Sequence, residues 1–261
     1  MTGGRGPGRV ILVGGGPGDP GLITVAGKQA LEAADVVVAD RLGPRALLAG
    51  LADGVEVIDV GKVSGNHPVP QEQINRILVD RARRGDVVVR LKGGDPYVLG
   101  RGGEEVLACR EAGIAVEVIP GITSAFAVPA AAGIPVTHRG SSGAVHVVTG
   151  HGGLTGAQVG SLRTGTVTIV VLMGVGALPG IARAALAAEV DPATPVAVIE
   201  QGTLPEQVVT RTTLGEVADD AACAGFGTPA VIVLGRVAAL DLGGRGTADA
   251  AATVESRTAD V

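Results

Sequence analysis

The stretch covering residues 87–105, VVVRLKGGDPYVLGRGGEE, constrains the fold of this chain more than any other. Its apolar run predicts a buried strand that ends at Lys92, and a charged helix is predicted to begin near Gly102. The loop between them opens with GGDP at 93–96, where two adjacent glycines leave the backbone open to a ligand. Open α/β sheets bind ligands where such loops follow the carboxyl ends of strands. The stretch therefore predicts the floor of a ligand pocket.

Apolar runs of this kind alternate with helical patterns through the first half of the chain. The predicted strands span residues 10–13, 36–38, 55–60, 87–91 and 116–119. The predicted helices cover residues 22–34, 44–51, 71–84 and 104–112. Strands that alternate with helices are typical of a parallel sheet. We expect a parallel α/β domain over residues 9–119.

The second half repeats the alternation with one difference. Its predicted strands lie near residues 145–149, 166–173, 196–200, 207–212 and 230–235. Its predicted helices lie near 178–188 and 214–224. Two consecutive strands late in this half predict a hairpin and hence a mixed sheet. We expect a second α/β domain over residues 139–240, a linker with a short apolar helix at 120–138, and disorder at 1–8 and 241–261.

Composition excludes several classes of function. The chain has a formal net charge of −5 and only three aromatic residues, which argues against a nucleic-acid partner. Its longest uncharged stretches contain prolines and glycines, so no membrane-spanning helix is expected. Neither the two cysteines, Cys109 and Cys223, nor the four histidines have the spacing of a metal site. The absence of a disulfide framework and of a signal peptide favours the cytoplasm.

A second glycine-rich loop, GGGPGDP at residues 14–20, follows the first predicted strand. It matches the dinucleotide fingerprint GxGxxG only in part, because Asp19 stands where the third glycine is needed. A nucleotide-binding oxidoreductase is therefore a weak alternative. The tripeptide Gly-Asp-Pro occurs in both loops, each after an apolar strand, which makes the pair more informative than either loop alone.

Asp40 and Lys62 each follow a predicted strand of the first domain. Both side chains are expected at the carboxyl edge of the sheet, where they could act as base and acid or simply form a surface ion pair. The tripeptide Thr137-His138-Arg139 offers donors suited to a carboxylate, or is a solvated loop. The residues alone leave these alternatives open.

Taken in order, the motifs resemble those of the tetrapyrrole methyltransferases, and most closely those members that act on uroporphyrinogen III. The resemblance spans roughly residues 10–235. It rests on the segments VILVGGGPGDPGLIT, ADVVVADRL, VGK, QEQIN, VVRLKGGDPYVLGRGGEE, VIPGITSA, AGIPVTHR, TGH, LMG and PVAVIEQGTLPEQ.

The resemblance implies a two-domain fold that binds S-adenosyl-L-methionine in a cleft between the domains, in a homodimer. The implied cofactor contacts are Pro17, Gly93, Gly94, Asp95, Val98, Thr123, Ser124, Met173 and Gly202. Asp40 matches the family's proton acceptor and Lys62 its proton donor. Arg41, Arg101 and Arg139 are candidate anchors for substrate carboxylates. Ala39, Gly43 and Asn66 differ from the residues common in the family, and all three border the expected substrate site.

The implied activity is methylation of uroporphyrinogen III at C2 and C7, giving precorrin-2 by way of precorrin-1 and feeding sirohaem or cobalamin synthesis. S-adenosyl-L-homocysteine is the expected by-product. A C-methyltransferase acting at another ring position of a later precorrin is the nearer alternative, and a non-catalytic cofactor-sensing module is the alternative from another class. Because the first predicted strand begins at Val10, we expect a stand-alone methyltransferase without an appended dehydrogenase–chelatase domain.

Overall fold

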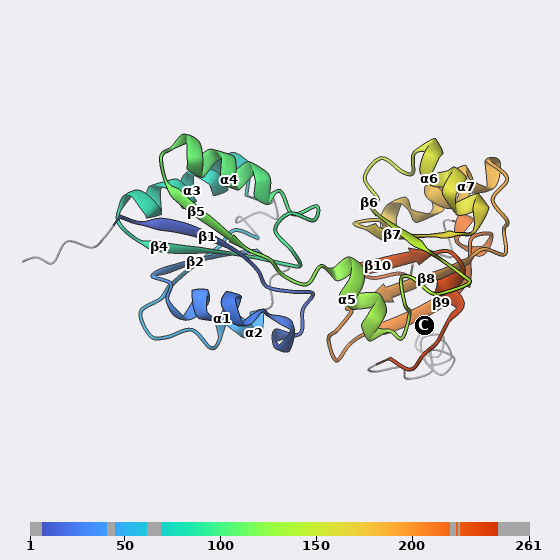
Figure 1. The fold of residues 1–261 in the computed structure, drawn as a ribbon, viewed down its shortest axis with the longest axis horizontal. Helices are drawn as coiled ribbons and strands as arrows, with labels where there is room; N and C mark the ends of the chain where they lie inside the picture. Colours follow the sequence, from blue (N-terminus) through green and yellow to red (C-terminus); the bar gives the residue numbers. More distant parts are fainter. Residues whose placement is uncertain (1–6, 41–44, 62–68, 220–222, 224, 245–261) are drawn as a thin grey trace, which may run out of the picture. The chain divides into compact units, whose positions relative to one another are not determined.

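The computed structural model describes residues 7–40, 45–61, 69–219, 223 and 225–244. The chain divides into two compact units, Met1–Thr123 and Ser124–Val261 (Figure 1). The predicted α/β fold class is confirmed, because the first unit holds a parallel sheet and the second a mixed one. Among the described residues, every helix is too short or too polar to cross a bilayer.

The first unit is built on a five-stranded parallel sheet with the strand order β3-β2-β4-β1-β5. The strands are β1 (Arg9–Gly14), β2 (Val36–Ala39), β3 (Glu56–Asp59), β4 (Val87–Lys92) and β5 (Ala115–Ile119). Almost every residue of β1, β2 and β4 is buried, as expected for a parallel sheet covered on both faces. The carboxyl ends of all five strands lie along one edge of this sheet.

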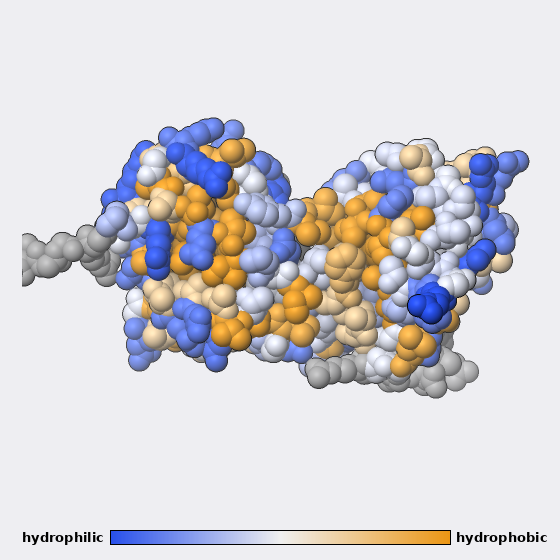
Figure 2. Space-filling model, viewed as in Figure 1, coloured by the Kyte–Doolittle hydropathy of each residue, from blue (hydrophilic) through white to orange (hydrophobic). Residues whose placement is uncertain are grey.

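Helices cover both faces of the first sheet. The helices α1 (Val25–Glu32) and α2 (Arg45–Leu48) pack on one face, and α3 (Gln71–Arg83) and α4 (Gly102–Glu111) on the other (Figure 1). A short 3₁₀ helix η1 (Pro20–Leu22) precedes α1. Figure 2 shows hydrophilic residues gathered over the outer side of α3 and α4. These helices are amphipathic, so their buried sides and the sheet form a continuous apolar core.

The second unit is built on a five-stranded mixed sheet with the strand order β6-β7-β10-β8-β9. Its strands are β6 (Ala144–Thr149), β7 (Val167–Leu172), β8 (Pro195–Glu200), β9 (Val208–Thr213) and β10 (Ala230–Leu234). The predicted hairpin is confirmed as the antiparallel pair β8 and β9. The strands β6, β7 and β8 run in one direction, and β9 and β10 run in the other.

Helices again cover both faces of this sheet. α6 (Gly156–Thr164) and α7 (Leu178–Ala187) pack on one face together with the 3₁₀ turns η2 (Val175–Ala177) and η3 (Glu216–Ala218). α5 (Ser124–Ala131) and the 3₁₀ helix η4 (Arg236–Ala239) pack on the other. Ala125 and Val128 of α5 are buried against this sheet, so α5 belongs to the core of the second unit.

The helix predicted at 214–224 is wrong over its first part. Within the described residues its beginning is only the short turn η3, and residues 220–222 and 224 lie outside the described ranges. The Glu216 carboxylate accepts hydrogen bonds from the hydroxyls of Thr212 and Thr213 and from the Thr213 backbone. These contacts tie Glu216 back to β9 and compete with a regular helix. Most of the segments predicted as disordered, 1–8 and 241–261, also lies outside the described ranges.

Candidate functional site

The carboxyl ends of β4, β1 and β5 meet backbone to backbone. Gly16 and Gly94 exchange two hydrogen bonds, with N to O distances of 3.2 and 2.7 Å. A Cβ atom on Gly14 would lie 2.4 Å from the Gly121 nitrogen, and one on Gly121 would lie 2.3 Å from the Gly94 oxygen. Only glycine allows this approach. The three strand ends therefore form a floor of closely packed backbone, in which Gly14 and Gly16 are buried and Gly93, Gly94 and Gly121 are partly exposed.

Asp95 fastens two loops of this floor together. Its Oδ1 accepts a hydrogen bond of 2.8 Å from the Tyr97 N–H, and its Oδ2 accepts one of 3.0 Å from the Gly121 N–H. The first contact closes the turn that follows β4, and the second joins that turn to the end of β5. Asp95 thus stabilises the loop that the sequence singled out, in addition to any contact it makes with a ligand.

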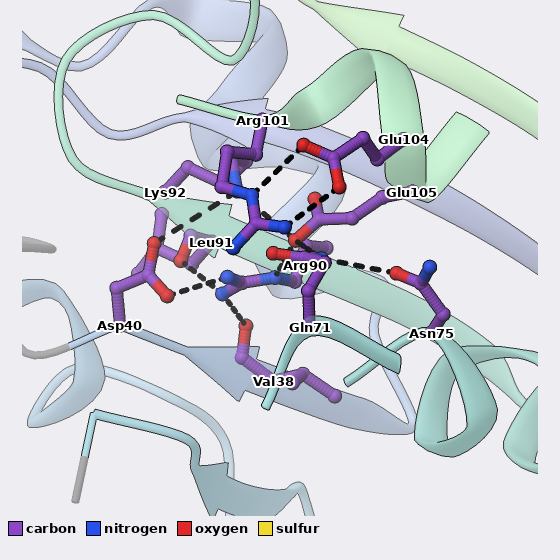
Figure 3. A network of polar contacts seen from close by, with 10 residues as sticks. All are labelled: Val38, Asp40, Gln71, Asn75, Arg90, Leu91, Lys92, Arg101, Glu104 and Glu105. Atoms are coloured by element: carbon purple, nitrogen blue, oxygen red, sulfur yellow. Dashed lines mark hydrogen bonds and ion pairs between the residues drawn. The ribbon is translucent and has the colours of Figure 1, made fainter. Parts of the chain in front are cut away.

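A buried network of charges lies beside this floor (Figure 3). Arg90 of β4 is 2% exposed and Glu105 of α4 is fully buried, and their Nε and Oε1 atoms lie 3.0 Å apart. The other Arg90 nitrogens donate to the backbone oxygens of Val38 and Leu91 at 3.2 Å and to the Asp40 carboxylate at 2.5 Å. The Arg90 guanidinium is therefore held on three sides and directs one N–H at Asp40.

Lys92, the last residue of β4, completes the network. Its Nζ lies 3.0 Å from Glu105 Oε1 and 4.0 Å from Asp40 Oδ2. Burial lowers the pKa of this ammonium below its usual value, and the neighbouring Arg90 charge lowers it further. Asp40 is the member of the network that reaches the surface, because its side chain is 30% exposed whereas those of Arg90, Lys92 and Glu105 are at most 3% exposed.

Arg101 stands at the entrance of α4 in a left-handed backbone conformation, with φ of 59°. Its guanidinium donates two hydrogen bonds to the Glu104 carboxylate in a bidentate arrangement, from Nε to Oε1 at 2.8 Å and from Nη2 to Oε2 at 2.7 Å. This hydrogen bonding raises the pKa of Arg101 and lowers that of Glu104. The Arg101 side chain is 57% exposed, so it remains within reach of a ligand carboxylate.

The corresponding edge of the second sheet is formed by the loops after β6, β7 and β8 and the start of β10. Met173 follows β7 with φ of 54° and is 49% exposed. Gln201 and Thr203 follow β8, also with positive φ, and a Cβ atom on Gly202 between them would lie 2.3 Å from Val128 of α5. Positive φ strains residues other than glycine, and such strain collects at functional sites.

Strained backbone marks the same kind of loop in both units. Among the described residues, six positions other than glycine have positive φ. Five of them, Leu99, Arg101, Met173, Gln201 and Thr203, follow the carboxyl ends of β4, β7 and β8, and the sixth, Glu189, follows α7. This pattern indicates functional loops independently of any motif.

Arg139 lies elsewhere in the second unit. It lines an open pocket of about 520 Å³ with His138, Ser141, Thr166 and Arg236, among other residues. Thr166 precedes β7 and Arg236 follows β10, so this pocket is at the sheet edge opposite Met173. The structure therefore does not bring Arg139 together with the loop after β7.

The other predicted site residues divide between the two units. Pro17, Gly93, Gly94, Asp95 and Val98 lie on the two glycine loops of the first sheet, and all five are partly exposed. Thr123 ends the first unit, and Ser124, Met173 and Gly202 belong to the second. Lys62, Arg41, Gly43 and Asn66 lie outside the described residues.

Sequence reasoning missed Arg90 and Glu105. A signal was present, because an arginine within VVVRLK interrupts the apolar run of a strand that is covered on both faces. A charge in such a position requires a buried partner of opposite sign. The two glutamates at the start of the following helix, Glu104 and Glu105, were the candidates.

Comparison with known proteins identifies the family to which this two-unit α/β chain is similar. Residues 9–218 match the family model of tetrapyrrole (corrin/porphyrin) methylases. The chain is 48% identical over 233 residues to a uroporphyrinogen-III C-methyltransferase of Methanocaldococcus jannaschii, covering 88% of this chain and 96% of that protein. It is also 48% identical to an S-adenosyl-L-methionine-dependent uroporphyrinogen III methyltransferase of Methanosarcina barkeri, covering 88% of this chain and 92% of that protein.

A solved structure of uroporphyrin-III C-methyl transferase from Thermus thermophilus, complexed with S-adenyl homocysteine, has the same fold. It superposes with a TM-score of 0.74 at 43% identity and covers 88% of this chain and 98% of that one. The family match extends through both units and includes both glycine loops, Asp40 and the strained loop after β7. This chain belongs to the tetrapyrrole (corrin/porphyrin) methylase family.

Proposed function

We propose that this protein transfers methyl groups from S-adenosyl-L-methionine to C2 and C7 of uroporphyrinogen III, giving precorrin-2 by way of precorrin-1. One observation carries the proposal: the partly exposed Asp40 carboxylate stands at the carboxyl edge of a parallel sheet, hydrogen-bonded to a buried arginine. That placement suits a general base, because the hydrogen bond holds the carboxylate in one orientation and the exposed side remains open to a substrate. The named activities of relatives 48% identical over nearly their whole lengths support the choice of substrate.

The residues present fit S-adenosyl-L-methionine. The partly exposed loops after β1 and β4 offer backbone donors and acceptors with no side chain at Gly93 and Gly94, which suits a polar ligand lying against the main chain. Pro17, Gly93, Gly94, Asp95, Val98 and Thr123 of the first unit, with Ser124, Met173 and Gly202 of the second, are the residues that would hold it. When bound, it supplies an electrophilic methyl group on a sulfonium.

Asp40 has the central part in the proposed mechanism. After a pyrrole carbon has gained its methyl group, the C–H bond or N–H bond of the cationic ring system breaks and Asp40 accepts the proton. The electron pair of that bond returns to the ring and restores its neutrality. Arg90 orients the Asp40 carboxylate through the hydrogen bond between them.

The remaining predicted residues have supporting roles in this proposal. Lys62 donates a proton or binds a carboxylate, and Arg41, Arg101 and Arg139 bind carboxylates of the substrate. Because Arg139 lies at the sheet edge opposite Met173, we assign it to a peripheral carboxylate rather than to the reacting ring. We further propose a cytoplasmic homodimer, and sedimentation of the purified protein tests the oligomeric state.

Anaerobic incubation of the purified protein with S-adenosyl-L-methionine and uroporphyrinogen III tests the function. We expect mass spectrometry to detect a singly and then a doubly methylated tetrapyrrole. The Asp40→Asn variant should lose turnover and keep its affinity for the cofactor. Cofactor binding without any methylated uroporphyrinogen III would overturn the proposal. Methylation of precorrin-2 instead would favour the alternative of a later ring position.

A further inference from the structure

The network beneath Asp40 is balanced in charge. It contains two cations, Arg90 and Lys92, and two carboxylates, Asp40 and Glu105. Glu105 is the deepest member, since its side chain is fully buried, and it contacts both cations. A buried carboxylate is costly unless it is paired, so Glu105 and the two cations depend on one another.

The contacts of Glu105 are concentrated on one oxygen. Oε1 accepts hydrogen bonds from Arg90 Nε at 3.0 Å, from Lys92 Nζ at 3.0 Å and from Gln71 Nε2 at 3.2 Å. Oε2 is buried and has no hydrogen-bond partner among the described residues. Glu105 thus fixes the far end of the guanidinium whose near end contacts Asp40.

We propose that Glu105 is a positioning residue for Asp40: through Arg90 and Lys92 it sets both the direction of the Asp40 carboxylate and the charge that this carboxylate faces. The inference rests on the proposed role of Asp40 as the base. Glu105 contacts no reacting atom in this scheme and acts only through the two cations of β4.

The sign of the effect follows from the charges. Without the negative charge of Glu105, the network gains one positive charge, which favours ionised Asp40 and makes it a weaker base. Without the positive charge of Lys92, the network gains one negative charge, which favours protonated Asp40. The charged groups drawn around Asp40 in Figure 3 are Arg90, Lys92, Glu104, Glu105 and Arg101. Asp59 on β3 adds a further carboxylate, because it pairs in register with Ala39, the neighbour of Asp40.

The Glu105→Gln variant isolates charge from geometry. Its amide oxygen can replace Oε1 and keep the three hydrogen bonds, and its NH₂ group takes the place of the unpartnered Oε2. We expect kcat to fall several-fold and the acid limb of its pH profile to move to lower pH. We expect cofactor affinity to stay at the wild-type value.

The Lys92→Met variant tests the opposite sign, because it should move the acid limb of the pH profile to higher pH. Glu111→Gln, on the exposed end of the same helix, is the matched control and should keep the wild-type profile. The pKa of Asp40, titrated by carbon-13 NMR of aspartate-labelled protein and assigned with Asp40→Asn, should follow the same signs without any substrate. If Glu105→Gln does not fold, the shifts measured in Lys92→Met alone decide whether the network governs Asp40.

Wild-type acid limbs and a wild-type Asp40 titration in both folded variants would overturn this inference and leave the proposed function standing. A wild-type protein that methylates no uroporphyrinogen III would instead defeat the proposed function. In that case the NMR titrations alone decide whether Glu105 governs Asp40, and opposite shifts in the two variants would still support it.

Discussion

The two sheet edges that carry the predicted site residues are built differently. The edge of the parallel sheet holds a buried ionic network and a glycine floor in which backbone meets backbone. The edge of the mixed sheet has strained loops at Met173, Gln201 and Thr203. There Gly150 packs against the backbone of Met173 and Gly174, and Gly202 packs against the side chain of Val128. The first edge therefore depends on paired buried charges, and the second depends on strained backbone.

This difference has an energetic consequence. In the first unit, each charge depends on buried partners, so a single change leaves another charge unpaired. In the second unit, the corresponding edge depends on backbone conformation and packing, and the ion pairs among its described residues are at least partly exposed, so a single change leaves no buried charge unpaired. The predictions below test this contrast, from the largest expected effect to the smallest.

Arg90→Met should have the largest effect on stability. It leaves Glu105 and Asp40 with Lys92 as the remaining cation of the network, and removing one partner of a buried pair costs about 3–5 kcal/mol. Chemical denaturation measures the change. Arg163→Met is the control in the second unit, because the Arg163–Glu189 pair is exposed and such pairs contribute at most about 1 kcal/mol. Equal losses in the two variants would contradict the contrast.

Gly121→Ala and Gly202→Ala compare the two kinds of close contact. The new Cβ atom would lie 2.3 Å from the Gly94 backbone oxygen in the first case and 2.3 Å from Val128 Cγ1 in the second. Each should cost about 1–3 kcal/mol, with the greater loss at Gly121 because backbone cannot rotate away.

Adding Val128→Ala to each variant distinguishes a clash with a side chain from a clash with backbone. In Gly202→Ala the second change removes Val128 Cγ1 and Cγ2, the two atoms nearest the new Cβ at 2.3 and 2.6 Å, so the two costs should fall short of additivity. In Gly121→Ala the second change is in the other unit and the two costs should add. Unfolding free energies of six proteins, namely the wild type, the three single variants and the two double variants, measure both sums. Additive costs at Gly202 would argue against the packing explanation.

Cys109 tests how strongly burial in the first unit changes the ionisation of a side chain. Burial raises the pKa of its thiol to about 11, with a further contribution from Glu105. The folded protein therefore keeps this proton at pH values where the unfolded chain releases it, and stability falls as pH rises from about 9 to 11. Cys109→Ala should remove a decline of up to about 3 kcal/mol relative to the wild type. Parallel pH curves for the two proteins would contradict this expectation.

The sequence predicted the strands of both sheets well because most of them, such as β1, β4, β7 and β10, are apolar runs. It also placed Asp40 and the GGDP loop at one sheet edge, since the carboxyl ends of parallel strands meet there. It did not predict that Arg90 and Glu105 meet, because their contact depends on the rotation of α4 against β4. That rotation is a property of tertiary packing, which local periodicity does not encode.

The second edge was harder to predict for a different reason. Met173 and Gly202 have no chemistry that marks them, and they entered only through the resemblance to a family. Their distinguishing property is backbone conformation, which a side chain other than glycine does not reveal in the sequence. The structure supplies it as positive φ at Met173 after β7 and at Gln201 and Thr203 after β8.

Met173 offers the smallest and most specific test of that strain. A left-handed conformation costs a residue with a Cβ atom about 1–2 kcal/mol, and glycine avoids most of this cost. Met173→Gly should therefore be more stable than Met173→Ala by about 1 kcal/mol, although both lose the same exposed side-chain contacts beyond Cβ. If cofactor affinity falls equally in the two variants, the Met173 side chain makes the contact. If it falls only in the glycine variant, the fixed backbone of this loop is what the cofactor needs, and the second edge shapes the site through conformation alone.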